Sequence, residues 1–225
     1  MHFLVDNYKK IIFSWSAKCG CSHIKKLFWY LQNNNIDNEI HTKYDFMKLP
    51  DDIENYIVII FCRNPYKRII SGFLDKYKKD GQYRHLWNYD KIIFSDFVDE
   101  LIKKNWEMIE RHHFTPQTTE AFNKNILTKS KHLLCYDIEK INYEYIESIF
   151  DKKIPIELLS FKGEHNRKNY NENYDGEVYD LDISIYHDYN VSIQNFYNLE
   201  IKSKVYQFYE KDFIFFKENG IDYEL

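Results

Sequence analysis

Residues 10–28 read KIIFSWSAKCGCSHIKKLF, and this segment carries the clearest signal for the fold of the chain. The run from Ile11 to Phe13 is short, apolar and rich in β-forming residues, which is typical of a strand buried on both faces. After Ser22, apolar residues recur at helical spacing. A buried strand that passes through a glycine-containing loop into a helix predicts an α/β fold.

The loop from Lys18 to Ser22 is a candidate anion site. Backbone N–H groups around Gly20, including those of Cys19 and Cys21, would converge with the helix N-terminus on one point, which suits a phosphate or a sulfate. Lys18 adds a full positive charge, and Ser22 adds a hydroxyl. A Walker A motif would end in Lys-Ser or Lys-Thr, whereas here the lysine comes first, so an ordinary kinase or GTPase is disfavoured.

A second informative segment covers residues 63–77, RNPYKRIISGFLDKY, and follows an uncharged, β-branched run over residues 56–62. That run is typical of a strand in the middle of a parallel sheet. Pro65 is typical of a helix start, where its missing N–H costs nothing. Arg68 and Ser71 are three residues apart and share a helix face. With Arg63 just before the helix, the three side chains can converge on one oxyanion.

Together the two segments resemble the nucleotide-binding motifs of sulfotransferases that use 3′-phosphoadenosine-5′-phosphosulfate (PAPS). The order Lys18, Gly20, Ser22 resembles the loop that holds the 5′-phosphosulfate, and Arg63 with Ser71 resembles the segment that binds the 3′-phosphate. The resemblance implies a P-loop-like three-layer domain in which helices flank a central, mainly parallel sheet. The chain departs from the family at residue 17, where an alanine stands in place of a common proline.

Weaker matches follow in the same order along the chain. Residues 113–117, HFTPQ, resemble the His-aromatic-x-Pro-Gln segment of carbohydrate-type sulfotransferases, which precedes a stretch close to the acceptor. Residues 163–170, GEHNRKNY, resemble the His-x-Asn loop of the family, and the match makes Arg167 a candidate nucleotide-binding residue. The last segment resembles the closing helix of these enzymes.

The resemblance implies transfer of a sulfuryl group from PAPS to a hydroxyl, with a glycan as the expected acceptor. Charge would build on the leaving 5′-phosphate, so positioning and fixed positive groups matter more than covalent chemistry. Lys18 would stabilise this leaving group. The acceptor needs a base whose pKa lies near the working pH. We choose His113 as this base, with His112 as the second candidate. The scheme uses no metal.

Composition limits the other possibilities. A chain of 225 residues suits one α/β domain, expected to span residues 1–225, and the net charge of −4 predicts no general attraction to nucleic acid. The four cysteines show no disulfide framework, and one Cys-x-Cys beside a His is a poor zinc signal. No run suits a membrane span, a signal peptide or a Golgi anchor, so we expect a soluble, cytoplasmic protein.

Two other functions stay open. A phosphotransferase with a degenerate P-loop would need magnesium and a strand that ends in Asp, whereas the strand over residues 56–62 is followed by Arg63. A noncatalytic nucleotide-binding or interaction protein on the same scaffold is the second. The joint presence of Lys18, Arg63 and a candidate base argues against it. For the acceptor, a tyrosine, a lipid or a small-molecule hydroxyl is an alternative to a glycan.

Overall fold

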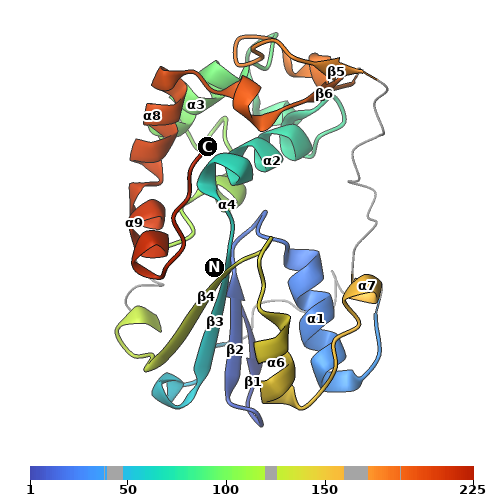
Figure 1. Ribbon diagram of the computed structural model, residues 1–225. Helices are drawn as coiled ribbons and strands as arrows, with labels where there is room; N and C mark the ends of the chain where they lie inside the picture. Colours follow the sequence, from blue (N-terminus) through green and yellow to red (C-terminus); the bar gives the residue numbers. More distant parts are fainter. Residues whose placement is uncertain (38, 40–47, 120–125, 160–171, 188) are drawn as a thin grey trace. The chain divides into compact units, whose positions relative to one another are not determined.

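The computed structural model describes residues 1–37, 39, 48–119, 126–159, 172–187 and 189–225 (Figure 1). The chain divides into two compact units. Unit 1 comprises residues 1–63, 117–162 and 215–221, and unit 2 comprises residues 64–116, 163–214 and 222–225. The predicted phosphosulfate loop belongs to unit 1, whereas the candidate histidines belong to unit 2.

Unit 1 is built on a four-stranded sheet with the strand order β1-β2-β3-β4. β1 (His2–Asp6) pairs antiparallel with β2 (Ile11–Trp15). β3 (Ile57–Cys62) lies parallel to β2 and to β4 (His132–Asp137). The expected mainly parallel sheet is therefore confirmed. β1 is an addition that we did not predict, and the carboxylate of Asp6 supports the turn into β2 by accepting the N–H groups of Tyr8 and Lys9.

Both faces of this sheet are covered. All five residues of β2 are buried, as are the last five of β3, which explains their continuous apolar sequences. On one face, α1 (Cys21–Asn33) and α6 (Tyr143–Phe150) contribute to a core around Phe13 (Figure 1). The ring of Phe13 lies 5.1 to 6.3 Å from the rings of Phe28, Phe61 and Phe150. Unit 1 also contains η2 (Ile53–Asn55) and α7 (Ile156–Leu159).

The start of α6 differs from the sequence prediction. Isoleucines at positions 138, 141, 146 and 149 recur at helical spacing and predict a helix over residues 137–150. Instead, α6 begins at Tyr143, because the side chain of Asn142 accepts the N–H of Tyr145 and caps the helix there. The residues before it form a turn in which Asp137 accepts the N–H of Glu139. A polar side chain that bonds to nearby backbone competes with helix formation, and here it moves the boundary by six residues.

Unit 2 is mainly helical. It contains α2 (Pro65–Tyr77), η3 (Arg84–Leu86), α3 (Phe94–Ile102), α4 (Arg111–Phe114), β5 (Asn173–Tyr174), η5 (Ile183–His187), β6 (Asn190–Val191), η6 (Ile193–Phe196) and α8 (Leu199–Phe208). α9 (Glu210–Glu218) runs from unit 2 into unit 1. The sequence of residues 94–106 predicts a helix with Ser95 or Asp96 as its N-cap, but α3 ends at Ile102. The predicted cap is wrong, because Ile93 is the N-cap and the hydroxyl of Ser95 donates to Asp180.

The core of unit 2 is aromatic. Phe97 is fully buried, and its ring centroid lies 4.9 Å from that of Phe114 and 5.1 Å from those of Phe73 and Tyr77. Aromatic pairs at such distances contribute about 0.5–1.5 kcal/mol beyond their buried area. Much of the aromatic content therefore builds a core that supports α2 and α4, the two helices of unit 2 that carry candidate site residues.

Gly72 permits the closest packing in this core. A Cβ at position 72 would lie 2.7 Å from a ring carbon of Phe114, which is fully buried. We expect Gly72→Ala to lower the free energy of unfolding by about 1–3 kcal/mol, because overpacking outweighs the better helix propensity of alanine. Thermal unfolding checks this against Ser203→Ala on the exposed face of α8, which should be close to neutral. Equal melting temperatures for the two variants would contradict the packing argument.

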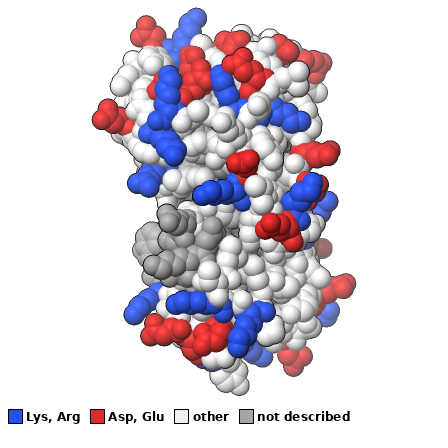
Figure 2. Space-filling model, turned by 90° about the vertical axis from the view of Figure 1, so that its left-hand side faces the viewer, with Lys and Arg blue, Asp and Glu red and all other residues white. Residues whose placement is uncertain are grey.

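Charges of both signs are mixed on the surface. Figure 2 shows one face of the molecule, on which Lys and Arg side chains are interspersed with Asp and Glu. In unit 2, for example, the amine of Lys204 on α8 lies 2.7 Å from Asp99 on α3 and 2.6 Å from Glu200. On this face, the mixture of charges gives no general attraction to anions. None of the described helices is both long and apolar enough to cross a membrane.

Candidate functional site

The loop between β2 and α1 has the backbone of a tight turn. The N–H of Cys19 donates to the carbonyl of Ser16 at 3.1 Å, and Lys18 at the third position of this turn has a φ of 67°. Gly20, with a φ of 71°, is the N-cap residue of α1. Cys21 and Ser22 are the first two residues of the helix. The loop thus leads directly into a helix N-terminus, whose N–H groups and dipole favour an anion.

Lys18 stands where the backbone favours glycine. A left-handed residue with a Cβ costs about 1 kcal/mol or more, and glycine is the usual residue with positive φ in turns of this kind. Strain of this sort concentrates at functional sites, where surrounding contacts hold it in place. The first turn of α1 also carries no acidic residue, so no helix carboxylate opposes an anion there. Both features favour an anion-binding role for the loop.

Arg63 lies at the same edge of the sheet, because the carboxyl ends of the parallel strands β2 and β3 coincide. Its Nη1 donates to the carbonyl of Lys18 at 3.1 Å. Gln117 contacts both segments. Its Nε2 donates to the carbonyl of Arg63 at 2.8 Å, and its Oε1 accepts the N–H of Arg63 at 3.0 Å and the thiol of Cys19 at 2.9 Å. The structure therefore brings Lys18, Cys19 and Arg63 together through Gln117, for which we had predicted no role.

The predicted 3′-phosphate segment continues on α2 in unit 2. Asn64 caps this helix by accepting the N–H of Tyr66 at 2.9 Å, and Pro65 opens it as expected. Arg68 is only 1% exposed, and its Nη1 donates to the carbonyl of Thr115 at 2.9 Å. Arg68 therefore also anchors the chain after α4. Ser71 is partly exposed one turn later, and phosphate binding by either residue stays a prediction.

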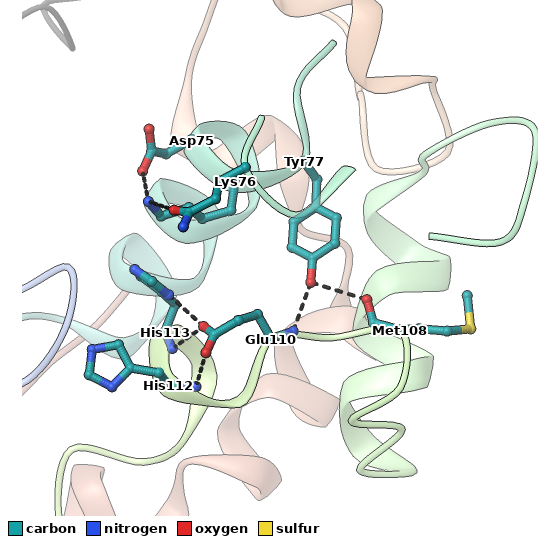
Figure 3. Close-up of polar contacts among 8 residues, drawn as sticks. Asp75, Lys76, Tyr77, Met108, Glu110, His112 and His113 are labelled. Atoms are coloured by element: carbon teal, nitrogen blue, oxygen red, sulfur yellow. Dashed lines mark hydrogen bonds and ion pairs between the residues drawn. The ribbon is translucent and has the colours of Figure 1, made fainter. Parts of the chain in front are cut away.

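His113 is paired with the carboxylate of Glu110, which we did not predict from the sequence. Oε2 of Glu110 lies 2.5 Å from Nδ1 of His113 (Figure 3). The two oxygens of Glu110 also accept the N–H groups of His112 at 2.8 Å and His113 at 2.9 Å, which caps α4. If Nδ1 donates its proton to Glu110, Nε2 carries the lone pair that a general base needs. The spacing of three residues between Glu110 and His113 is the only feature of the sequence that could have indicated this pair.

The pKa values of this pair follow from burial and from their contact. Burial lowers the pKa of His113 below its ordinary value, and the hydrogen bond and charge of Glu110 only partly offset this. Burial raises the pKa of Glu110, but its bonds to His113 and to the backbone outweigh burial, so this pKa lies below its ordinary value. At neutral pH the pair is therefore a carboxylate beside a neutral imidazole, which is the protonation state of a general base.

Tyr77 fixes the backbone beneath this pair. Its hydroxyl accepts the N–H of Glu110 at 2.9 Å and donates to the carbonyl of Met108 at 3.1 Å (Figure 3). Burial raises the pKa of Tyr77 well above its ordinary value, so the hydroxyl keeps its proton.

The two histidines differ in their surroundings. His112 is exposed, and its ring plane is at 90° to that of His113.

Some predicted features fall outside what the structure tests. Arg167 and its loop lie outside the described residues. Lys18 and His113 belong to different units, so their meeting in one cleft stays a prediction.

Within the described ranges, no three His, Cys, Asp or Glu side chains gather as a metal site would require. The four cysteines are not disulfide-bonded, although the sulfurs of Cys62 and Cys135 lie 3.6 Å apart.

Comparisons with known proteins point to one family. A model of the sulfotransferase family matches residues 1–217. Carbohydrate sulfotransferase 9 of Homo sapiens is 25% identical over 95 residues, which cover 36% of this chain and 21% of that protein. The match thus spans about a fifth of that relative's length. No solved structure matches the chain.

Proposed function

Because this chain belongs to the sulfotransferase family, we propose that it transfers a sulfuryl group from PAPS to a hydroxyl acceptor, with carbohydrate as the acceptor class. The observation that carries the proposal is the loop of residues 16–20, where a left-handed Lys18 is followed by a glycine N-cap. The carbohydrate part rests on the weak match to a carbohydrate sulfotransferase and on the HFTPQ segment.

The residues of the loop fit a phosphosulfate. Lys18 would neutralise charge on the leaving 5′-phosphate, and the hydroxyl of Ser22 with the first N–H groups of α1 would hold the phosphate oxygens. Arg63 and Ser71 would bind the 3′-phosphate, the group that distinguishes this nucleotide from ATP. PAPS would supply the sulfuryl group. The protein would supply position and fixed positive charge.

The Glu110–His113 pair fits the acceptor side of this reaction. Nε2 of His113 would accept the proton of the attacking hydroxyl, and Glu110 at Nδ1 would orient the ring and stabilise the imidazolium that forms. The lowered pKa of His113 keeps the ring neutral at neutral pH, so the base is ready before the acceptor binds. No described group in this scheme needs a metal ion.

The proposal predicts a specific nucleotide preference. The protein should bind 3′-phosphoadenosine-5′-phosphate (PAP) more tightly than AMP or ATP by about tenfold or more, the scale of a hydrogen bond to a charged group. Magnesium should not be required. Calorimetry with the three nucleotides, with and without magnesium, measures this. Equal affinity for PAP and AMP, or binding that depends on magnesium, would contradict the proposed cofactor.

A transfer assay tests the acceptor class. The protein would be incubated with radiolabelled PAPS and a mixed panel of glycans, peptides and small alcohols, and the labelled product identified. Label on glycans supports the carbohydrate assignment, whereas label on a peptide tyrosine or on a small alcohol replaces it. Tight PAP binding without label on any acceptor would favour the noncatalytic alternative.

A further inference from the structure

Gln117 occupies a place where the sheet would otherwise be incomplete. β2 ends at Trp15, which pairs with Phe61, so the strand stops two residues short of the level of Arg63. The side-chain amide of Gln117 fills this position and bonds to both the N–H and the carbonyl of Arg63. It does so as the backbone of a longer β2 would. Gln117 is 1% exposed, so these bonds are shielded from water.

The same amide connects Arg63 with the loop in front of it. Oε1 of Gln117 accepts the thiol of Cys19, and Nη1 of Arg63 donates to the carbonyl of Lys18. These contacts form a closed circuit through residues 18, 19, 63 and 117, all within unit 1. The circuit holds Lys18 and Cys19, the two residues at the strained part of the loop. A left-handed residue persists where its surroundings leave it no alternative.

We propose that Gln117 is a positioning residue, which keeps Lys18 in its left-handed conformation and aligns Arg63 with the loop. The inference rests on the proposed function, because that function gives the loop its ligand. Gln117 would act through Lys18 and Arg63 and would not itself bind the nucleotide. Without its amide, the main chain of Arg63 loses two partners, and the loop can relax to a shape in which Lys18 points elsewhere.

The first test needs no ligand. Gln117→Met keeps the length of the side chain but removes its hydrogen bonds, and Gln207→Met on the exposed face of α8 is the matched control. Hydrogen–deuterium exchange of a peptide that covers residues 16–20 should rise by about tenfold or more in Gln117→Met, the scale of a lost buried partner. It should not change in Gln207→Met. Unchanged exchange in both variants overturns the inference.

Cys19→Ala is the companion variant in case Gln117→Met does not fold. It removes the bond between the thiol and Oε1 of Gln117 and leaves the bonds to Arg63 intact. Exchange over residues 16–20 should rise in this variant by about twofold or more, because one weak partner of the circuit is lost, while exchange elsewhere stays unchanged. An increase spread over the whole of unit 1 would instead indicate a general packing role and would overturn the positioning role.

The second test separates positioning from general stabilisation. Turnover would be measured for Gln117→Met, Lys18→Ala and the double variant at saturating PAPS, where an effect of Gln117 on nucleotide binding through Arg63 does not enter. If Gln117 acts through Lys18, Gln117→Met lowers turnover about tenfold in the wild-type background but has little further effect beside Lys18→Ala. Additive losses would overturn the inference. A wild-type protein that fails to bind PAP refutes the proposed function instead, while the exchange experiment still decides whether Gln117 holds the loop.

Discussion

Lys18→Ala is expected to lower turnover by about 10²-fold or more, with a much smaller loss of PAP affinity, because it removes a preorganised donor to the transition state. The negative charge on the leaving 5′-phosphate grows as its bond to sulfur breaks. A fixed cation beside it therefore gains more in the transition state than in the bound ground state. Steady-state rates at saturating PAPS, together with calorimetry of PAP binding, measure the two effects separately.

Two controls separate the lysine side chain from the backbone that carries it. Lys104 also has positive φ, 56°, and is exposed in unit 2, so Lys104→Ala makes the same chemical change at a similar backbone conformation away from the loop. Lys18→Gly fits a left-handed position without strain, so any loss of turnover there cannot come from a distorted turn. If Lys18→Ala and Lys18→Gly both kept wild-type turnover, the leaving-group role of Lys18 would be wrong.

The predictable parts of the fold are those whose signals are local. β3 could be read from the sequence because a strand covered on both faces is apolar throughout, and α2 because Pro65 marks its first turn. β1 escaped prediction because its place depends on pairing with β2 rather than on a pattern of its own. The predicted start of α6 was wrong because Asn142 caps the helix several residues further along the chain than we expected.

The difference between local and long-range signals also explains which residues of the candidate site could be predicted from the sequence. The loop around Gly20 has a fixed order of residue types, so Lys18 and Ser22 could be named from the sequence alone. Gln117 could not, because its partners lie 54 and 98 residues away and are defined by hydrogen bonds that only the folded chain forms. Glu110 lies between these cases. It is three residues from His113, but a glutamate at this spacing also serves as a plain helix cap, as it does for α4.

His113→Ala is expected to reduce turnover by about 10² to 10⁴, the usual contribution of a positioned proton acceptor, while PAP affinity stays near that of the wild type. His112→Ala is the control. His112 is exposed and its ring is perpendicular to that of His113, so its loss should have little effect on turnover. Equal losses in the two variants would remove the assignment of His113 as the base.

The pH profile gives an independent test of the pair. Burial and the charge of Lys76 lower the pKa of His113, whereas Glu110 raises it, so wild-type turnover should hold through neutral pH and fall only below the ordinary histidine pKa. Glu110→Gln removes the raising contribution. Its acid limb should therefore move to still lower pH, even though the plateau falls because the imidazolium loses its partner. A limb that stayed in place, or moved upward, would show that the group titrating in turnover is not a histidine held by Glu110.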